Sequence, residues 1–207
     1  MSEPRLHSVN AGRARPVPWG SVGRSAIDKR RVEGPVRVHC LGVDGDEQAD
    51  RRHHGGTEQA VYAYARADLD LWAAELLRDL NDGVFGENLT TEQLDLSAAR
   101  VGERWRIGSV LLEVTTPRIP CRVFQGWLDE PQWVKRFTAY GRPGTYLRVV
   151  EEGVLQVGDP IDVVHVPGHH VTVGHAFRAL TTERHLLPAI AAVPGMHPHL
   201  VAAAEGR

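Results

Sequence analysis

Short runs in which apolar and polar residues alternate recur along most of this 207-residue chain, and turn-forming residues separate them. Alternation with a period of two is typical of a strand with one buried face, and clusters of Gly, Pro, Asn and Asp are typical of turns. Many short strands joined in this way favour a mostly antiparallel barrel. The clearest runs lie at 35–41, 102–108, 110–115, 145–150 and 161–166.

Helical patterns interrupt the strands at two places. From residue 66 to residue 81 the apolar residues fall at i, i+3, i+7 and i+11, which is one face of an amphipathic helix. A second helical segment is expected at 127–140, with a break near Pro131. We therefore expect a mostly β (β+α) fold, with helices inserted between the strands of the barrel.

The composition changes after Pro167, where Ala- and Leu-rich pieces are broken by prolines. This change predicts a short helical C-terminal extension. We expect a barrel domain at 1–167 and the extension at 168–207.

The charge and cysteine content exclude several classes of protein. The formal net charge of −2 and the lack of a basic stripe interleaved with aromatics give no reason to expect a nucleic-acid partner. Two cysteines exclude a disulfide framework and indicate a reducing compartment. We find no apolar run of about 18 residues and no signal-like N-terminus, so we expect a cytoplasmic protein with no membrane association.

Cys121 is one candidate for chemistry because two arginines flank it and two prolines precede it, in Pro117-Arg118-Ile119-Pro120-Cys121-Arg122. Nearby guanidinium charge favours the thiolate, which is the form that attacks or binds a metal. The alternative is a buried, inert thiol at a strand end. Cys40 lacks this setting, and we expect it to pack in the core.

The polar segment 42–56 is a second candidate, because it gathers acids, arginines, glycines and the adjacent His53 and His54. Three interpretations stay open: a metal site with Asp44, Asp46 and Glu47, a phosphate cradle, or a solvated loop. The spacing matches no established zinc pattern. His169, His170, His197 and His199 are expected at the surface.

Two further polar clusters can contribute to a pocket. The segment 25–30 offers Ser25 and Lys29 to a phosphate, and the segment 85–90 places an amide, a hydroxyl and a glycine beside a strand. Neither is specific alone. The sequence contains no nucleophile elbow, no P-loop and no dinucleotide fingerprint.

Taken in order, these segments resemble the MOSC domain family, named after the C-terminal domain of molybdenum cofactor sulfurase, and in particular its YiiM-like branch. The ordered set is specific although each piece is not, and the tail resembles an abbreviated form of the extension in that branch. The resemblance is carried by residues 25–29, 45–50, 53–56, 85–90, 117–121, 135–137 and 144–149.

The resemblance implies a MOSC-type β-barrel that binds the molybdenum cofactor, molybdopterin with molybdenum. Reductases of the family remove oxygen from N-hydroxylated compounds such as hydroxylaminopurines and amidoximes. The implied activity is therefore a molybdenum-dependent reduction of a small N-hydroxylated substrate, independent of pyridoxal phosphate. No flavin or iron–sulfur motif is evident, so a separate electron-donor protein is expected.

The resemblance also implies roles for individual residues. Cys121 is expected to coordinate the metal, Arg118 and Arg122 to keep it ionised, and either water or Glu87 to donate the protons. Positive groups and glycine N–H groups would offset the phosphate, while amides and carboxylates would bind the pterin. The expected cofactor-binding residues are Ser25, Lys29, Asp46, Gln48, Arg52, His53, Gly55, Gly56, Gly86, Asn88 and Arg118.

Other functions fit the same residues. Cys121 could carry a persulfide and deliver its sulfur, or the chain could carry the cofactor without turnover. A metal-dependent hydrolase built on His53 and His54 is a further alternative. The sequence indicates no oligomeric state.

Overall fold

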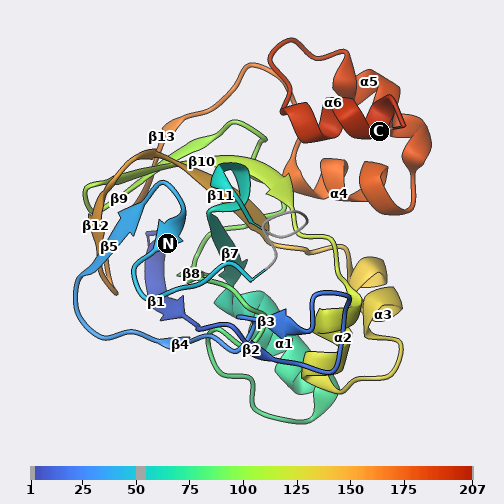
Figure 1. Cartoon of the computed structure of the whole chain (residues 1–207). Coiled ribbons are helices and arrows are strands. Elements are labelled where there is room, and N and C mark those ends of the chain that lie inside the picture. The colour runs from blue at the N-terminus through green and yellow to red at the C-terminus, as the bar shows by residue number, and fades with distance from the viewer. Residues whose placement is uncertain (1–2, 50–54, 207) are drawn as a thin grey trace.

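The computed structural model describes residues 3–49 and 55–206 and shows a mixed α/β fold around one large sheet (Figure 1). The eight strands of that sheet lie in the order β13 (Ile161–His165), β9 (Arg104–Ile107), β10 (Val110–Pro117), β11 (Thr145–Glu151), β7 (Val61–Ala65), β8 (Leu89–Glu92), β1 (Arg5–Ala11) and β4 (Arg30–Arg31). A three-stranded sheet has the order β12 (Gly153–Leu155), β5 (Val36–His39) and β6 (Gly42–Val43). A hairpin pairs β2 (Arg15–Pro16) with β3 (Arg24–Ser25).

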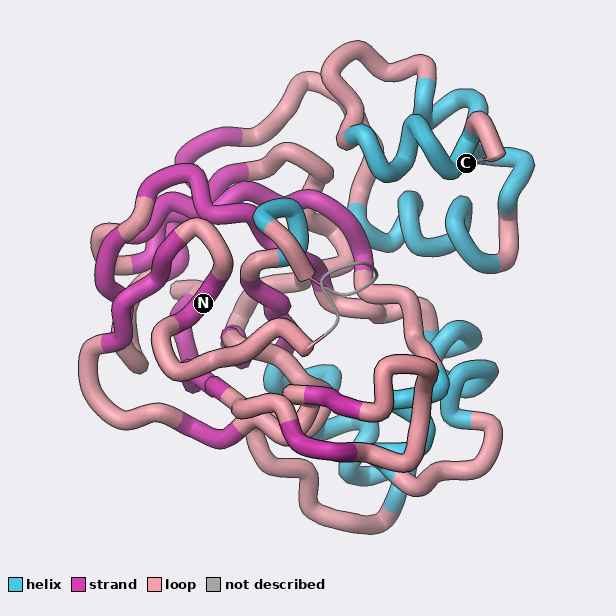
Figure 2. The backbone as a smooth tube through the Cα atoms, in the orientation of Figure 1, coloured by secondary structure: helices cyan, strands magenta, loops and turns pink. Residues whose placement is uncertain are grey.

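Six α-helices and two 3₁₀ helices complete the described part of the chain (Figure 2). Three α-helices lie between strands in the sequence, and three form the C-terminal extension. They are α1 (Arg66–Leu76), α2 (Arg122–Leu128), α3 (Trp133–Tyr140), α4 (Val173–Thr181), α5 (Leu187–Ala191) and α6 (Pro198–Ala204), with η1 (Thr57–Gln59) and η2 (Arg184–Leu186). No helix of the described residues is both long enough and apolar enough to cross a membrane.

The described strand pairs are antiparallel except for β7 and β8, in which Ala63 lies opposite Leu89. Parallel neighbours need a crossover connection between them, and α1 lies within that connection. Its buried Leu69 and Trp72 confirm the predicted apolar face. The helix ends earlier than expected, because Leu77 adopts the left-handed conformation with φ 52°.

The closed barrel is not confirmed. The strand ladder runs from β13 at one edge to β4 at the other. An isolated bridge between Arg5 and Pro160, and a 2.9 Å hydrogen bond from the Leu6 N–H to the Asp159 carbonyl, bring β1 toward the start of β13. Within the described residues these contacts do not extend the ladder around a full circle, so the architecture is a large sheet with helices.

An aromatic cluster fixes α1, α2 and α3 beneath β7. The ring centroids of Trp72 and Trp133 are 4.5 Å apart, and those of Phe85 and Phe124 are 5.1 Å apart. All four side chains are buried. Of the helical segment predicted at 127–140, α3 lies after the predicted break, whereas α2 lies before it and begins five residues earlier than expected, at Arg122. This cluster determines where the N-terminus of α2, and therefore Cys121, lies.

The C-terminal extension has an apolar cluster of its own, which includes Ala176, Ile190 and Leu200. It also docks on the rest of the chain, since the Val173 N–H donates to the Ala99 carbonyl at 2.9 Å. The predicted helical character is confirmed. The boundary at 167/168 stays a prediction.

The expectation that Cys40 packs in the core is wrong. Cys40 is exposed in the turn after β5, and its N–H donates to the Glu152 carboxylate at 2.8 Å. Alternation correctly identified the strand, but the strand ends at His39, so position 40 no longer faces the interior.

Candidate active site

A cavity of about 910 Å³ lies between the β2–β3 hairpin, the segment after β6, β7 and the N-terminus of α2. This volume is within the usual range for a small-molecule site. Much of its wall was predicted from the sequence: Ser25, Lys29, Asp46, Gln48, Gly86, Asn88, Arg118 and Cys121 all line it. These residues come from four separate stretches of the chain. The fold therefore brings together four of the segments that carried the family resemblance, 25–29, 45–50, 85–90 and 117–121.

A buried hydrogen-bonded group forms one wall. The Lys29 ammonium forms an ion pair with Asp46 Oδ1, which also accepts from the Gly12 N–H at 2.8 Å. Asp46 Oδ2 accepts from Asn88 Nδ2 at 2.9 Å. Desolvation lowers the pKa of Lys29, and the neighbouring Asp46 charge opposes that change. Lys29 is therefore largely neutralised by Asp46 before any ligand binds.

The amide side chains at the wall hold the protein's own backbone. Asn88 Nδ2 donates to the Asn10 carbonyl at 3.2 Å as well as to Asp46, and Asn88 Oδ1 accepts from the Tyr62 N–H at 3.1 Å. Both N–H groups of Asn88 are therefore occupied. The amide aligns β7 with β8 and leaves an acceptor lone pair for a ligand.

Gln48 has a similar structural task. Its Nε2 donates to the Leu41 carbonyl at 2.9 Å, and its Oε1 accepts from the Gly56 N–H at 2.8 Å. The Gly56 N–H, which the sequence assigned to a phosphate, is bound to Gln48 in this structure. Neither Gly55 nor Gly56 lines the cavity. Arg52 and His53 lie outside the described residues.

Glu87 is fully buried and does not line the cavity. Its carboxylate accepts from the Gly83 N–H at 2.6 Å, from the Phe85 N–H at 3.0 Å and from the Thr90 hydroxyl at 3.1 Å. Burial raises the pKa of Glu87 to about 7, against the effect of these hydrogen bonds. Its visible role is to fix the turn that presents Gly86 to the cavity.

Gly86 and Ser25 set the shape of the adjacent wall. Gly86 has φ +79°, and a Cβ there would stand 3.1 Å from Cγ1 of Ile27, so a glycine is required. The Ser25 hydroxyl accepts from the Ile27 N–H at 3.2 Å. Gly86 therefore lets the segment 25–27 approach the turn closely, and the Ser25 hydroxyl stabilises the local backbone of that segment.

Arg118 is a buried cation on the cavity wall, and no carboxylate among the described residues forms an ion pair with it. Its guanidinium donates to the Phe85 carbonyl. Its Cζ lies 4.0 Å from the centre of the Phe124 ring and 5.0 Å from that of Tyr62. Aromatic faces attract a cation but supply no countercharge. The site therefore favours an anion at this wall.

Cys121 supplies a sulfur to the same cavity, at the N-cap position of α2. Desolvation opposes the charge on Arg118, but interactions with Tyr62, Tyr146 and Cys121 raise the pKa of Arg118 overall. Arg118 and Cys121 are thus close enough to interact electrostatically, while the predicted effect of Arg118 on the thiol stays a prediction. The exposed Arg122 also lines the cavity.

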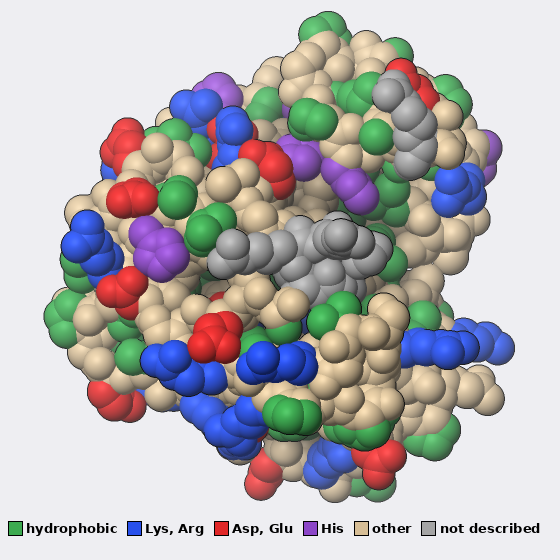
Figure 3. Space-filling view, viewed as in Figure 1, with side chains coloured by type: hydrophobic (Ala, Val, Ile, Leu, Met, Phe, Trp, Pro, Cys, Tyr) green, Lys and Arg blue, Asp and Glu red, His purple; other side chains and the backbone are tan. Residues whose placement is uncertain are grey.

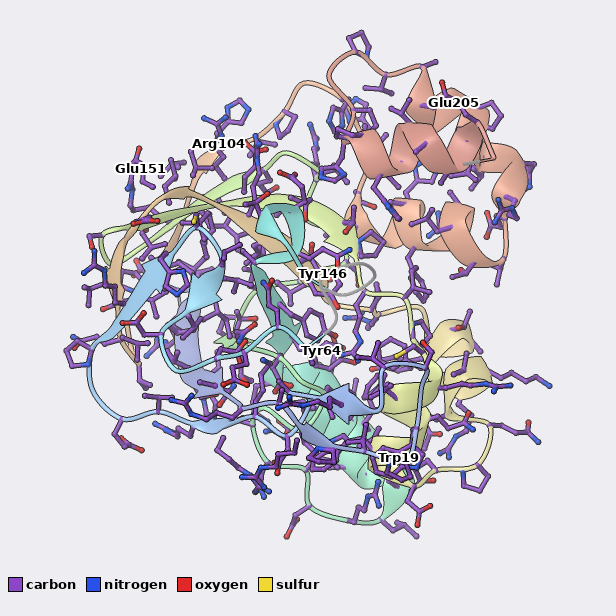
Figure 4. All side chains as sticks on the ribbon, viewed as in Figure 1. Trp19, Tyr64, Arg104, Tyr146, Glu151 and Glu205 are labelled. Carbon is purple, nitrogen blue, oxygen red and sulfur yellow. The ribbon has the colours of Figure 1, made fainter. Side chains whose placement is uncertain are left out.

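Three aromatic residues of the wall were not predicted. Tyr62 and Tyr146 lie opposite one another on β7 and β11, with ring centroids 5.2 Å apart. Burial raises the pKa of both hydroxyls, so both stay protonated at neutral pH. Trp19 lies over Gly126 of α2 (Figure 4), where a Cβ would overlap its ring. Nothing in the local sequence around Trp19 shows that it contacts a helix more than 100 residues later in the chain.

A metal site made of protein ligands alone finds no support in the described part of the chain. No group of three His, Cys, Asp or Glu side chains there can hold a metal ion. Asp46 is occupied by Lys29, and His39 lies 3.6 Å from Asp44. His197, expected at the surface, is instead largely covered and lies 2.8 Å from Glu58.

Comparisons with known proteins agree with this geometry. The sequence profile of the MOSC domain matches residues 50–162. The protein YiiM of Escherichia coli (strain K12) is 32% identical over 159 residues, which are 75% of this chain and 70% of that protein. The chain belongs to the MOSC domain family. In this MOSC protein the segment 117–121, which ends at Cys121, lies within the matched region.

Two further relatives extend the comparison. The crystal structure of YiiM from Geobacillus stearothermophilus superposes with a TM-score of 0.82 and 25% identity, and the match covers 98% of each chain. A protein of Gibberella moniliformis (strain M3125 / FGSC 7600) named "Reductase" is 38% identical over 166 residues, or 78% of this chain. That alignment spans only 29% of the fungal protein, so this MOSC chain matches less than a third of its length.

Proposed function

We propose that this protein binds a molybdenum cofactor in the cavity and reduces small N-hydroxylated compounds to amines. One observation carries the proposal. Cys121 shares a cavity with the buried Arg118, which has aromatic and carbonyl neighbours but no carboxylate partner among the described residues. A soft thiolate beside an uncompensated cation suits an anionic ligand that contains a soft metal.

The residues present fit this group. Cys121 would bind the metal, and Arg118 would keep the sulfur ionised. Because Lys29 is already paired with Asp46, the rim residues Arg24 and Arg122 are better placed to offset a phosphate. We retain Arg52 and His53, which lie outside the described residues, as proposed contacts of the cofactor, whereas Gly55 does not line the cavity. When bound, the cofactor supplies the two-electron redox chemistry that no side chain here can perform.

The aromatic wall suits a flat substrate. Tyr62 and Tyr146 present two neighbouring rings beside the guanidinium of Arg118. A planar heterocycle can stack on such a surface while its N-hydroxyl group points toward Cys121. This arrangement would hold the substrate near the sulfur and exclude water from its faces.

The overall reaction consumes two electrons and two protons and yields an amine and water. Glu87 can hold a proton near neutral pH, but it has no surface in the cavity. We therefore take solvent in the cavity as the immediate proton source. We assign to Glu87 the structural role of fixing the turn that contains Gly86. The electrons would come from a separate redox protein, because the sequence has no evident flavin or iron–sulfur motif.

The proposal is tested by metal analysis and Cys121→Ala. The protein is expressed in cells that make the cofactor, and N-hydroxylated purine reduction is measured with dithionite as the electron source. The wild type should retain about one molybdenum per chain and turn over, while Cys121→Ala should lose turnover with an unchanged melting curve. Cys40→Ala is the matched control, since Cys40 is exposed and does not line the cavity.

Three results would contradict the proposal. Undiminished turnover in Cys121→Ala would remove the thiolate as an essential ligand. A wild type that binds one zinc and no molybdenum would favour the hydrolase. A labile extra sulfur on Cys121, without molybdenum, would instead favour sulfur transfer.

A further inference from the structure

Basic residues are concentrated in one segment of this slightly acidic chain. Between residues 12 and 32 the sequence contains five arginines and Lys29 but one acid, Asp28, whereas the whole chain has a formal net charge of −2. Lys29 is buried, and all five arginines are exposed. We name this set the basic rim: Arg13, Arg15, Arg24, Arg30 and Arg31, with the exposed Arg122 of α2.

The basic rim borders the cavity. Arg24 and Arg122 line it directly. Arg15 pairs in register with Ser25, and Arg13 lies 3.1 Å from Glu47; both of these partners line the cavity too. In Figure 3, Lys and Arg side chains gather in a band over the β2–β3 hairpin. Four of the six arginines therefore line the cavity or contact a residue that does, and Arg30 and Arg31 continue the positive charge along β4.

Ion pairs do not neutralise the basic rim. Arg15 and Arg30 share Asp28, at 3.4 Å and 2.7 Å, and Arg24 donates to the Ala14 carbonyl. Six guanidinium groups thus face three carboxylates (Asp28, Glu33 and Glu47), and net positive charge remains.

The features of the rim favour an acidic protein over other polyanions. Single-stranded nucleic acid is usually bound through exposed aromatic rings, and no aromatic side chain in residues 3–49 and 55–206 is exposed. Membrane surfaces are bound through basic residues together with exposed apolar ones. Val22 is the one large apolar side chain of this segment that is exposed, at 47%.

We propose that the basic rim is the docking surface for the electron donor, a small acidic protein that carries a flavin or an iron–sulfur cluster. This inference rests on the proposed function, which requires two external electrons per turnover. Charge complementarity steers the encounter, and the rim would place the donor at the opening of the cavity.

The test compares two charge reversals that change the net charge equally. Arg15→Glu with Arg31→Glu alters the rim without touching the cavity wall, and Asp28 keeps Arg30. Arg178→Glu with Arg184→Glu is the control in the extension. Flavodoxin serves as the acidic probe, and its binding to the cofactor-free chain is measured by calorimetry at low salt. The loaded enzyme is then assayed with reduced flavodoxin and, separately, with dithionite.

We expect the rim variant to bind flavodoxin at least about tenfold more weakly at low salt and to lose flavodoxin-driven turnover in proportion. The difference should disappear near 0.5 M salt, where charges are screened over about 4 Å. Dithionite-driven turnover should be unchanged, which also shows that the hairpin is intact. Equal losses in both variants, or a wild type that does not bind flavodoxin, would overturn the docking surface. Failure of the wild type with dithionite would instead contradict the proposed function.

Discussion

The Nε2 atom of His197, just before α6, lies 2.8 Å from Oε2 of Glu58 in η1. The other ring nitrogen, Nδ1, accepts from the His199 N–H at 3.3 Å. A nitrogen that accepts carries no proton, so the neutral ring donates through Nε2 to Glu58. Gln59 and Ala60, which follow Glu58, line the cavity. The extension is thereby tied to the cavity wall.

His197→Ala should loosen this tie. Loss of the hydrogen bond should cost about 1 kcal/mol and should increase amide exchange at 55–60 and in α6. Hydrogen exchange followed by mass spectrometry measures both segments. His199→Ala is the control, because the exposed His199 ring lacks a comparable partner among the described residues. Equal exchange in the two variants would show that the tie has no mechanical effect.

Arg118→Gln should make Cys121 less reactive. Removing a buried cation beside a thiol disfavours the thiolate, and a nearby opposite charge typically shifts such equilibria by about 1–3 pH units. The rate of alkylation of Cys121 by iodoacetamide is measured as a function of pH in a Cys40→Ser background. The midpoint of this pH–rate profile should shift to higher pH in Arg118→Gln. Arg122→Gln, which removes an exposed charge, should move it less. An unchanged pH–rate profile in Arg118→Gln would show that Arg118 does not promote ionisation of Cys121.

Glu87 should give the stability a measurable pH dependence. Burial raises its pKa to about 7 from an ordinary value of 4.5, so the folded state holds the proton more tightly than the unfolded chain. The stabilisation is complete below pH 4.5 and is lost as the pH rises to about 7. The loss amounts to about 3 kcal/mol at most. Urea unfolding between pH 4 and 8 should show this slope.

Glu87→Gln removes that slope, because the amide does not titrate. The variant should also be less stable at every pH, since one end of the amide meets the N–H of Phe85 or Gly83. The readout is therefore the slope and not the absolute stability. A variant whose stability falls with pH as steeply as that of the wild type would place the titrating group elsewhere.

Asn88→Ala should weaken the structure more than cofactor binding alone would explain. Its amide joins β7 to the loop containing Asp46, and its removal leaves the buried Tyr62 N–H and one Asp46 oxygen without their present partners. We expect a loss of about 2–4 kcal/mol in the cofactor-free protein, measured by thermal unfolding. Ser25→Ala, at the more open wall, should cost well under half of that. Similar melting temperatures for the two variants would contradict this assignment.

The sequence predicted local elements well and long-range geometry incompletely. Alternation identified the strands that become β5, β9, β10, β11 and β13, because a strand with one buried face imposes a period of two. The parallel pairing of β7 with β8 has no comparable local signal. Closure of the barrel was inferred from the number of strands, which does not determine how the edges of a sheet meet.

The site followed the same rule. Cys121, Arg118 and Lys29 were identified because their residue types indicate chemistry, and the fold places them on one cavity. The structural tasks of Asn88 and Gln48 depend on backbone groups distant in sequence, which no motif reveals. Trp19 and Tyr146 were missed because an aromatic residue in a cavity wall looks, in sequence, like one in the core.

Trp19 of the cavity wall can contact α2 only because residue 126 is a glycine, whose side chain is a single hydrogen atom. The β2–β3 hairpin has strands of two residues each, which are too short to be stable alone. The contact of Trp19 with α2 therefore fixes the position of the hairpin. Even a methyl group at position 126 would displace the Trp19 side chain and so change the shape of the cavity wall. The size of the cavity thus depends on Gly126, a residue that does not line the cavity and would not contact a ligand.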